Sequence, residues 1–365
     1  PPNASNLGLK FEPTEFPRKW KPGRDKYSPL LGNNDTIGAV GLTGATFVTL
    51  SNAEATIEDG VDLYGDSLLV DADNDGLALT LGASGGKAIK AGNGVGLASV
   101  VDNTTYAQIE DGARIQVGDN DISEDDDSTS LIVEATDTAT LVTVAGTLAL
   151  GGRTGVGVSA GLTTDIRDTR AVVGSLEEDA AVSATGTVST AAGMDVKAES
   201  NGFIASIAVA GAGAGDSRGD RSLSAKEPAA IALGAGMAIN VSEETVAAYV
   251  NAPSLTVAGQ LDVASTFAPT LEAFAIGGSV VASNKSGRDG VAVAGAAAAN
   301  RVDGDIRAFV DGSTINATAG GVSVEATDNS KVLAQSGAVA IAWNIPETGG
   351  NAVNRSVSAG LSVTV

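Results

Sequence analysis

Three carboxylates at alternate positions form the strongest local pattern for chemistry in this chain. Asp71, Asp73 and Asp75 are followed directly by Gly76. A hard cation such as Ca²⁺ prefers about six to eight oxygen ligands, and glycine permits the sharp turn that a binding loop needs. We therefore predict a Ca²⁺ site at these three aspartates. The EF-hand pattern fails, because its twelfth position is Gly82, and a solvated turn is the alternative.

Pairs of carboxylates that could serve acid–base catalysis are a second candidate. β-Helices can host polysaccharide lyases and glycosidases that use such pairs, often beside aromatic platforms. Asp165, Asp168, Asp303 and Asp305 could supply them, but the sequence places no aromatic residue beside a pair, and the chain has no His for work near neutral pH. We predict that the protein is not an enzyme, and a carbohydrate-active enzyme or tailspike-like domain is the alternative.

Residues 1–31 differ in composition from the rest of the chain. They contain six of the ten prolines and six Lys or Arg against three Asp or Glu. Proline at this density blocks helices and central strands, so we predict an extended arm. The arm either packs on the protein itself or straps onto a neighbouring subunit. Its candidate partner-binding residues are the four aromatics Phe11, Phe16, Trp20 and Tyr27.

The overall charge and the missing cysteines limit the partners. The formal net charge is -22, and the residues after the arm contain 41 acidic and 16 basic groups. Such a field repels nucleic acid and favours divalent cations, so we predict no nucleic-acid partner. Without Cys the chain has no disulfide or thiolate metal site, and no apolar run is long enough to predict a membrane span.

A strand-and-turn phrase recurs along the chain at intervals of 52 to 77 residues. Self-similarity at such a period is typical of stacked architectures. Companion strands with an apolar-x-Val-x-Ala pattern follow the phrase, and alternating Val and Ala predict one buried face. Gly- and Ala-rich stretches complete each repeat and are also predicted as strands. The copies of the phrase begin at Glu54, Tyr106, Arg170, Ala247 and Arg307.

These patterns predict an all-β fold and, within it, a β-solenoid over residues 32–365, preceded by the arm at 1–31. We expect about five to six repeats of two coils each, built from short strands. Charged interruptions at 119–128, 165–179 and 216–228 are expected to loop out at coil corners as candidate binding surfaces. The last phrase stops at Val365, so we expect that the native chain continues or that another molecule pairs with its edge.

The turn Ala308-Phe-Val-Asp-Gly312 and the strand Val322-Ser-Val-Glu-Ala326 resemble the β-strand repeats of very large bacterial surface proteins. These include filamentous-haemagglutinin-like and leukotoxin-like filamentous adhesins. The resemblance covers residues 33–365 and implies a right-handed parallel β-helix at the cell surface or outside the cell, acting in adhesion or matrix formation. The arm has no counterpart in that family.

The sequence therefore predicts a structural extracellular β-solenoid, as a subunit or segment of a bacterial surface filament or giant adhesin. We expect self-association end to end, with the arm contacting a neighbour, and host or surface glycans as further partners. Ca²⁺ would bridge the acidic coat. A Ca²⁺-dependent binding module is a third hypothesis, which a change of melting temperature on chelation would support.

Overall fold

The computed structural model describes residues 38–118, 129–176, 186–215, 230–252, 254–283, 290–344 and 354–364, all within one unit, Gly38–Val365. Every regular element in these ranges is a β-strand, which confirms the predicted all-β class. No helix in the described ranges is long and apolar enough to cross a membrane.

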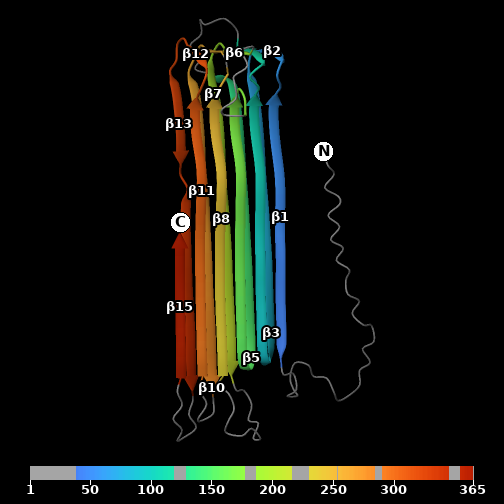
Figure 1. Ribbon diagram of the computed structural model, residues 1–365, viewed down its shortest axis with the longest axis vertical. Coiled ribbons are helices and arrows are strands. Elements are labelled where there is room, and N and C mark those ends of the chain that lie inside the picture. Colours follow the sequence, from blue (N-terminus) through green and yellow to red (C-terminus); the bar gives the residue numbers. More distant parts are fainter. Residues whose placement is uncertain are drawn as a thin grey trace, which may run out of the picture. The chain divides into compact units, whose positions relative to one another are not determined.

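Long strands, which alternate in direction, are joined at one end by short ones (Figure 1). Each turn of the chain contributes one long strand of each direction and one short strand between them. The strands are β1 Ala39–Ile57, β2 Asp62–Gly65, β3 Leu68–Ile109, β4 Arg114–Val117, β5 Thr129–Val173, β6 Thr187–Thr190, β7 Gly193–Gly215, β8 Ala230–Val250, β9 Ser254–Val257, β10 Leu261–Ser283, β11 Gly290–Val310, β12 Thr314–Ala317, β13 Val322–Asp328, β14 Lys331–Asn344 and β15 Asn354–Thr364.

The long strands form two layers. The β8 layer contains β1, residues 91–109 of β3, residues 154–173 of β5, and β8, β11 and β15. The β7 layer contains residues 68–88 of β3, residues 131–151 of β5, and β7, β10, β13 and β14. The short strands form a separate sheet in the order β12-β9-β6-β4-β2.

Every described strand pair is parallel, and the predicted repeat sets the register. Glu54 pairs with Tyr106, Tyr106 with Arg170, Arg170 with Ala247, and Ala247 with Arg307. The five copies of the recurring phrase therefore lie side by side, residue for residue. This confirms the predicted repeat.

Two expectations about the strands were wrong. The predicted strands are short, whereas β7 and β10 are each 23 residues long, because Gly- and Ala-rich stretches continue the companion strands without a break. The predicted division of each repeat into two coils also differs from the pairing, since paired residues lie a whole repeat apart.

The Asp-Gly turns lie at the end that carries the short strands. Gly60 and Gly312 have φ of 75° and 60°, a left-handed conformation that glycine adopts at little cost. Inside this end lies an apolar core to which both layers and the short strands contribute. Its fully buried members include Ile109, Leu131, Met194, Val250, Leu255 and Leu261.

Away from the turns, small residues bring the two layers very close together. A Cβ built on Gly234 would lie 2.1 Å from the carbonyl oxygen of Gly278, and one on Gly155 would lie 2.2 Å from that of Gly213. Normal sheet packing leaves about 10 Å between layers filled with side chains. Here the backbones themselves approach, so only glycine fits at these positions.

Candidate functional site

A layer of buried polar side chains crosses the interior between the apolar core and the small-residue region. Strands of both sheet layers supply these side chains. In the β8 layer, Asn103, Arg167 and Glu244 are consecutive partners on adjacent strands. Asn74, Asp137 and Ser200 form the corresponding row in the β7 layer. We call this set, together with Thr105, Asp165 and Ser242, the polar layer.

Arg167 is the centre of the polar layer. Its guanidinium is fully buried and binds three carboxylates: Asp165 at 3.0 Å, Asp137 at 3.3 Å and Glu244 at 2.7 Å. A further bond of 2.5 Å runs from Nη1 to the carbonyl oxygen of Asn201. One cation thus neutralises part of the charge of three buried carboxyl groups, from three different strand segments.

Asp137 receives the neutral donors of the polar layer. Thr105 Oγ1 donates to it at 2.9 Å, Asn74 Nδ2 at 3.2 Å and Asn103 Nδ2 at 3.4 Å. These donors come from both layers, so the carboxylate joins three strand segments.

Glu244 is held by two hydroxyl groups in addition to Arg167. Ser200 Oγ donates at 2.5 Å and Ser242 Oγ at 2.7 Å. The polar layer ends at the next strands, where Phe267 follows Ser200 in the register and Gly304 follows Glu244. A Cβ on Gly304 would lie 3.0 Å from the Phe267 ring, so the aromatic side chain fills this space.

The polar layer holds three carboxyl groups and one guanidinium, and this excess of acidic groups shifts the pKa of Asp165 and of Arg167. Burial, with the charges of Glu244 and Asp137 added, raises the pKa of Asp165 to about 7, although Arg167 opposes the shift. Burial lowers the pKa of Arg167, but the three carboxylates outweigh burial and raise it above its ordinary value. Arg167 therefore stays charged, and Asp165 is the group that takes up a proton near neutral pH. Its Oδ1 atom has no hydrogen-bond partner.

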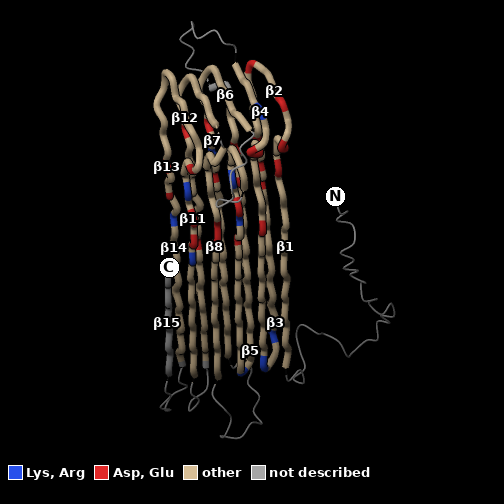
Figure 2. Tube along the Cα trace, turned by 45° about the horizontal axis from the view of Figure 1, so that its top comes forward, with Lys and Arg blue, Asp and Glu red and all other residues tan. Residues whose placement is uncertain are grey.

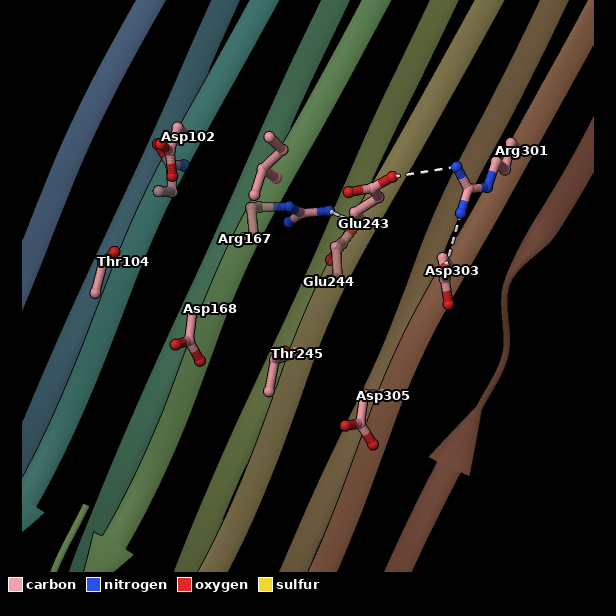
Figure 3. A pocket seen from close by; sticks show the side chains of 12 residues that line it. Asp102, Thr104, Arg167, Asp168, Glu243, Glu244, Thr245, Arg301, Asp303 and Asp305 are labelled. Atoms are coloured by element: carbon pink, nitrogen blue, oxygen red, sulfur yellow. Dashed lines mark hydrogen bonds and ion pairs between the residues drawn. The ribbon is translucent and has the colours of Figure 1, made fainter. Parts of the chain in front are cut away.

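Outside the polar layer, the β8 layer carries a shallow groove of about 420 Å³ (Figure 3). Outward carboxylates line it on neighbouring strands, and Figure 3 shows them in parallel rows. Arg301 bridges two of them, at 3.3 Å from Glu243 and 3.0 Å from Asp303. The acidic residues that line the groove are Asp102, Asp168, Glu243, Asp303 and Asp305.

Asp168 anchors a second cluster on this face. Tyr106 Oη donates to it at 2.6 Å and Arg170 Nε at 2.7 Å. Burial, the hydrogen bond and the charge of Asp168 raise the pKa of Tyr106 to about 12. The guanidinium of Arg170 also lies 5.9 Å from the centre of the Tyr106 ring, within cation–π range.

The three aspartates predicted to bind Ca²⁺ lie along one regular strand. Asp71, Asp73 and Asp75 are all exposed on the outer side of β3, and Gly76 continues the strand, so the alternative of a turn at this place was wrong. Alternate residues of a strand are about 6.6 Å apart, so the three side chains do not converge. Within the described ranges, no three acidic side chains are grouped closely enough to hold a metal ion.

The strand places Asp71 next to Glu134 instead, as direct partners in the register. Burial and the charge of Asp71 raise the pKa of Glu134. Negative charge therefore gathers across strands at this place. Ca²⁺ binding by Asp71, Asp73 and Asp75 stays a prediction.

The other predicted residues have mixed outcomes. Phe11, Phe16, Trp20 and Tyr27 lie outside the described residues, as do the interruptions 119–128 and 216–228. The expected loop at 165–179 was wrong over its first part, because residues 165–173 complete β5 and Asp165 is buried. The period of two continues there, with charges on both faces of the strand.

The four candidate catalytic carboxylates do not form a shared pair. Asp165 faces the interior, while Asp168 faces the groove. Each binds a basic residue two positions away on its own strand, and Asp303 and Asp305 do the same with Arg301 and Arg307. Residues two apart on a strand share a face, so these are local ion pairs.

Sequence reasoning missed Arg167, Asp137 and Glu244. The signal was the run Asp165-Ile-Arg-Asp-Thr-Arg170, in which two Asp-x-Arg pairs follow one another directly, so that one pair occupies odd positions and the other even positions of the strand. Such a run in a strand must place one pair on each face. Since one face is buried, one of the two ion pairs has to lie inside the protein.

Comparisons with known proteins found no counterpart: no family model matches the chain, and neither the curated proteins nor the solved structures contain a match. The site must therefore be judged from its own chemistry. The polar layer links strands of both layers by charged hydrogen bonds, which fixes their relative register. The groove outside presents acidic groups to solvent and suits cationic or polyhydroxyl ligands better than anionic ones.

Proposed function

We propose that this protein is a structural module of a bacterial surface filament or a large adhesin, working outside the cell and assembling end to end. Within this proposal the two layers and the short-strand sheet are successive sides of a β-solenoid. The parallel pairing of residues one repeat apart supports that architecture. The resemblance to β-strand-repeat surface proteins supports the extracellular setting.

The exposed interior at the last described strands carries the proposal. Leu261 and Val263 of β10 are 0% and 1% exposed. Their partners in β13, Val322 and Val324, point the same way but are 49% and 46% exposed. A further strand of the same kind would bury both valines, as β10 buries its own residues. At the opposite edge, β1 pairs on one side only among the described strands.

Unpaired sheet edges are templates for further strands. Each added strand contributes a full row of backbone hydrogen bonds in addition to the apolar burial. Assembly along the stacking direction therefore needs no separate recognition element, and the polar layer would hold each module in register. The proposed mechanism is mechanical, with backbone hydrogen bonds carrying load along the stack.

Substitution of an edge valine tests the proposal. We expect Val324→Lys to reduce end-to-end assembly of the purified chain, because pairing with a further strand would bury the new lysine side chain. Leu333→Lys is the matched control: Leu333 is 45% exposed in β14 but points to the outer face. Assembly is measured by negative-stain imaging and sedimentation velocity. Equal assembly of both variants, or short isolated particles of the unmodified chain at every concentration, would contradict the proposal.

The arm and the acidic coat have separate tests. If Phe16 and Trp20 strap onto a neighbour, the double variant Phe16→Ala/Trp20→Ala will form shorter assemblies than the unmodified chain. If Ca²⁺ bridges the coat, chelation will lower the melting temperature, and Asp71→Asn/Asp73→Asn will remove that response. Filaments of unchanged length, or a melting temperature indifferent to chelator, would remove these parts of the proposal and leave edge assembly standing.

The alternative of a carbohydrate-active enzyme rests on the acidic groove of the β8 layer. Glu243 and Asp303 are direct partners on adjacent strands, about 5 Å apart in the backbone. Both carboxylates, however, bind Arg301, which opposes a role as proton donor. Release of reducing ends from surface polysaccharides by the unmodified chain, lost in Glu243→Gln, would favour this alternative.

A further inference from the structure

The outer face of the β8 layer is apolar over most of its length. Five described strand segments, 39–49, 91–101, 154–164, 231–241 and 290–300, contain no charged residue. Large side chains on this face point into solvent: Leu42 is 83% exposed and Met237 is 44% exposed. Figure 2 shows the separation, with acidic residues gathered toward the short strands, a long uncharged stretch beyond them, and Lys or Arg again at the far ends of β3 and β5.

This face has a ridge beside a hollow. The hollow, about 390 Å³, lies over Gly44, Gly96 and Ala98 on the first two strands of the layer. Leu162 and Met237, on the next two strands, form its raised side. Glycine and alanine leave the space open, and leucine and methionine project above it.

The register puts the ridge and the hollow at the same height along the strands. One row across the layer reads Gly44, Gly96, Ala160, Met237. The next outward row reads Thr46, Ala98, Leu162, Ile239. In each row the small residues lie on the first strands and the large ones on the later strands.

Such rows are complementary to themselves after a half-turn about an axis parallel to the strands. The rotation keeps height and reverses strand order, so the first strand faces the fourth and the second faces the third. Large residues then face small ones: Met237 meets Gly44, and Leu162 meets Ala98. In the same two rows Gly96 meets Ala160 and Thr46 meets Ile239. The row before them follows the same rule, pairing Leu42 with Ala235 and Gly94 with Val158, whereas the row after them pairs Val48 with Val241.

We propose that the uncharged outer face of the β8 layer binds the same face of a second copy of this chain, with the ridge of each copy in the hollow of the other. A twofold arrangement of this kind is closed and uses one patch twice. The four strands that face each other, with about 11 residues each, cover roughly 700 Å² on each copy at the usual strand spacings. The total of about 1,400 Å² lies within the range of about 1,200 to 2,000 Å² that specific interfaces bury.

The arrangement of residues favours a second copy over lipid hydrocarbon. The central rows of the face place small and large residues in matched positions, which a fluid partner would not require.

The proposed interface lies beside a mainly acidic border, in which Arg301 follows the uncharged segment 290–300 and pairs with Glu243. Asp102 and Glu243 continue the outward rows just beyond the uncharged segments. In the twofold arrangement these carboxylates approach their counterparts in the second copy and repel them. Association should therefore become tighter as salt rises, the reverse of association driven by opposite charges.

Charged substitutions across the axis test the proposal on the full chain. In sedimentation velocity, the unmodified chain should form a dimer, and Leu162→Lys should raise its dissociation constant by at least about tenfold. Val209→Lys is the matched control, since Val209 is 41% exposed on the outer face of the β7 layer and Leu162 is 39% exposed. This control should change the constant by less than about twofold.

A mixture provides the decisive measurement. Ala98→Glu alone should also weaken the dimer, because two carboxylates enter the apolar interface. Mixing Ala98→Glu chains with Leu162→Lys chains should restore a heterodimer, since a lysine then faces a glutamate. Val324→Lys should leave this dimer intact, which separates the face from the proposed end-to-end assembly.

Several results would overturn the proposal. These are a monomeric unmodified chain at all salt concentrations, equal loss of dimer in Val209→Lys, or no recovery in the mixture. Flotation of the unmodified chain with phosphatidylcholine vesicles, abolished by Leu162→Lys, would assign the face to lipid. A monomer that dimerises only in Phe16→Ala/Trp20→Ala would assign the face to the arm of the same chain.

Discussion

The end of the stack near the short strands and the region beyond the polar layer bury and expose opposite kinds of residue. Near the short strands the interior is apolar, with Ile109, Leu131 and Val250 fully buried, and the surface is charged. Beyond the polar layer the interior is mostly Ala, Gly, Ser and Thr, with a few buried large side chains such as Leu141 and Leu271, and many large apolar side chains face outward. Only the first region resembles the usual interior of a globular protein.

This difference separates two ways of holding sheets together. Side-chain burial stabilises the first region, at about 25 cal/mol for each Å² of apolar surface. In the second, the layers approach to backbone contact through glycine, so little apolar area is buried between them. Its outer surface then has apolar area left over, which is the basis for the interface with a second copy. The polar layer lies at the boundary between the two regions.

The largest effect is expected at that boundary. Arg167→Met would leave Asp137, Asp165 and Glu244 buried without their cation. Removal of one partner from a buried ion pair costs about 3 to 5 kcal/mol. We expect a loss of that size in the free energy of unfolding, measured by chemical denaturation. Arg301→Met is the control, because Arg301 lies on the exposed outer face of the β8 layer. This substitution should lower the free energy of unfolding by less than about 1 kcal/mol.

Such an outcome would make the boundary essential to both regions. If Arg167→Met were as stable as the unmodified chain, the polar layer would not contribute to stability. The apolar region and the small-residue region would then be packed independently of each other.

The next largest effect is expected from filling the narrow interior. A methyl group at Gly234 would lie 2.1 Å from a backbone oxygen of the facing layer, so the layers must separate. Overpacking of this kind costs about 1 to 3 kcal/mol. We expect Gly234→Ala to lower the free energy of unfolding by about 2 kcal/mol. Gly337→Ala is the control, because no atom lies within 4 Å of the added Cβ. Equal stability of the two variants would contradict the close approach.

The repeat could be predicted from sequence, but the inversion between the two regions could not. The recurring phrase carries its own register, since Ala and, two residues later, Ile or Val occupy fixed places in each copy and pair in the sheet. Farther along each strand, Gly and Ala alternate with Val and Leu, and either set could face inward. Only the distance between the layers decides this, and that distance depends on contacts far apart in the chain.

Local composition was misleading at two places for the same reason. Asp71 to Gly76 has the residues of a turn, and 165–179 has those of a loop. At Asp71–Gly76 and over residues 165–173, pairing with strands one repeat away overrides this local preference. Asp73, for example, pairs with Thr136. The polar layer was invisible because its members lie on six strand segments, and nothing local marks Asp137 or Glu244 as buried.

A pH dependence should distinguish the boundary from the surface. The pKa of Asp165 is raised from 3.8 to about 7, so the folded state binds its proton more tightly than the unfolded chain. Its stabilising contribution is fully present below pH 3.8 and is lost as the pH rises through about 7. We expect the free energy of unfolding to fall across this window by no more than the roughly 4 kcal/mol to which such a shift corresponds. Denaturation curves at several pH values measure it.

Asp165→Asn should remove this particular slope, because the amide does not titrate. At pH 8 the variant should match or exceed the unmodified chain in stability, and at pH 4 it should have no advantage. If the free energy of unfolding of Asp165→Asn still fell with rising pH in this window, a group other than Asp165 would be titrating.

The smallest effect concerns Tyr106, on the charged outer face. Burial and the neighbouring Asp168 raise the pKa of its phenol to about 12. We expect ultraviolet absorbance titration to show one tyrosine ionising near pH 12, and Asp168→Asn to return it toward 10. Stability should change by less than about 1 kcal/mol, since the group is partly exposed. A loss of several kcal/mol in the free energy of unfolding would mean that the outer face near the short strands stabilises the fold about as much as the polar layer does. The charged surface at this end would then be part of what holds the protein together.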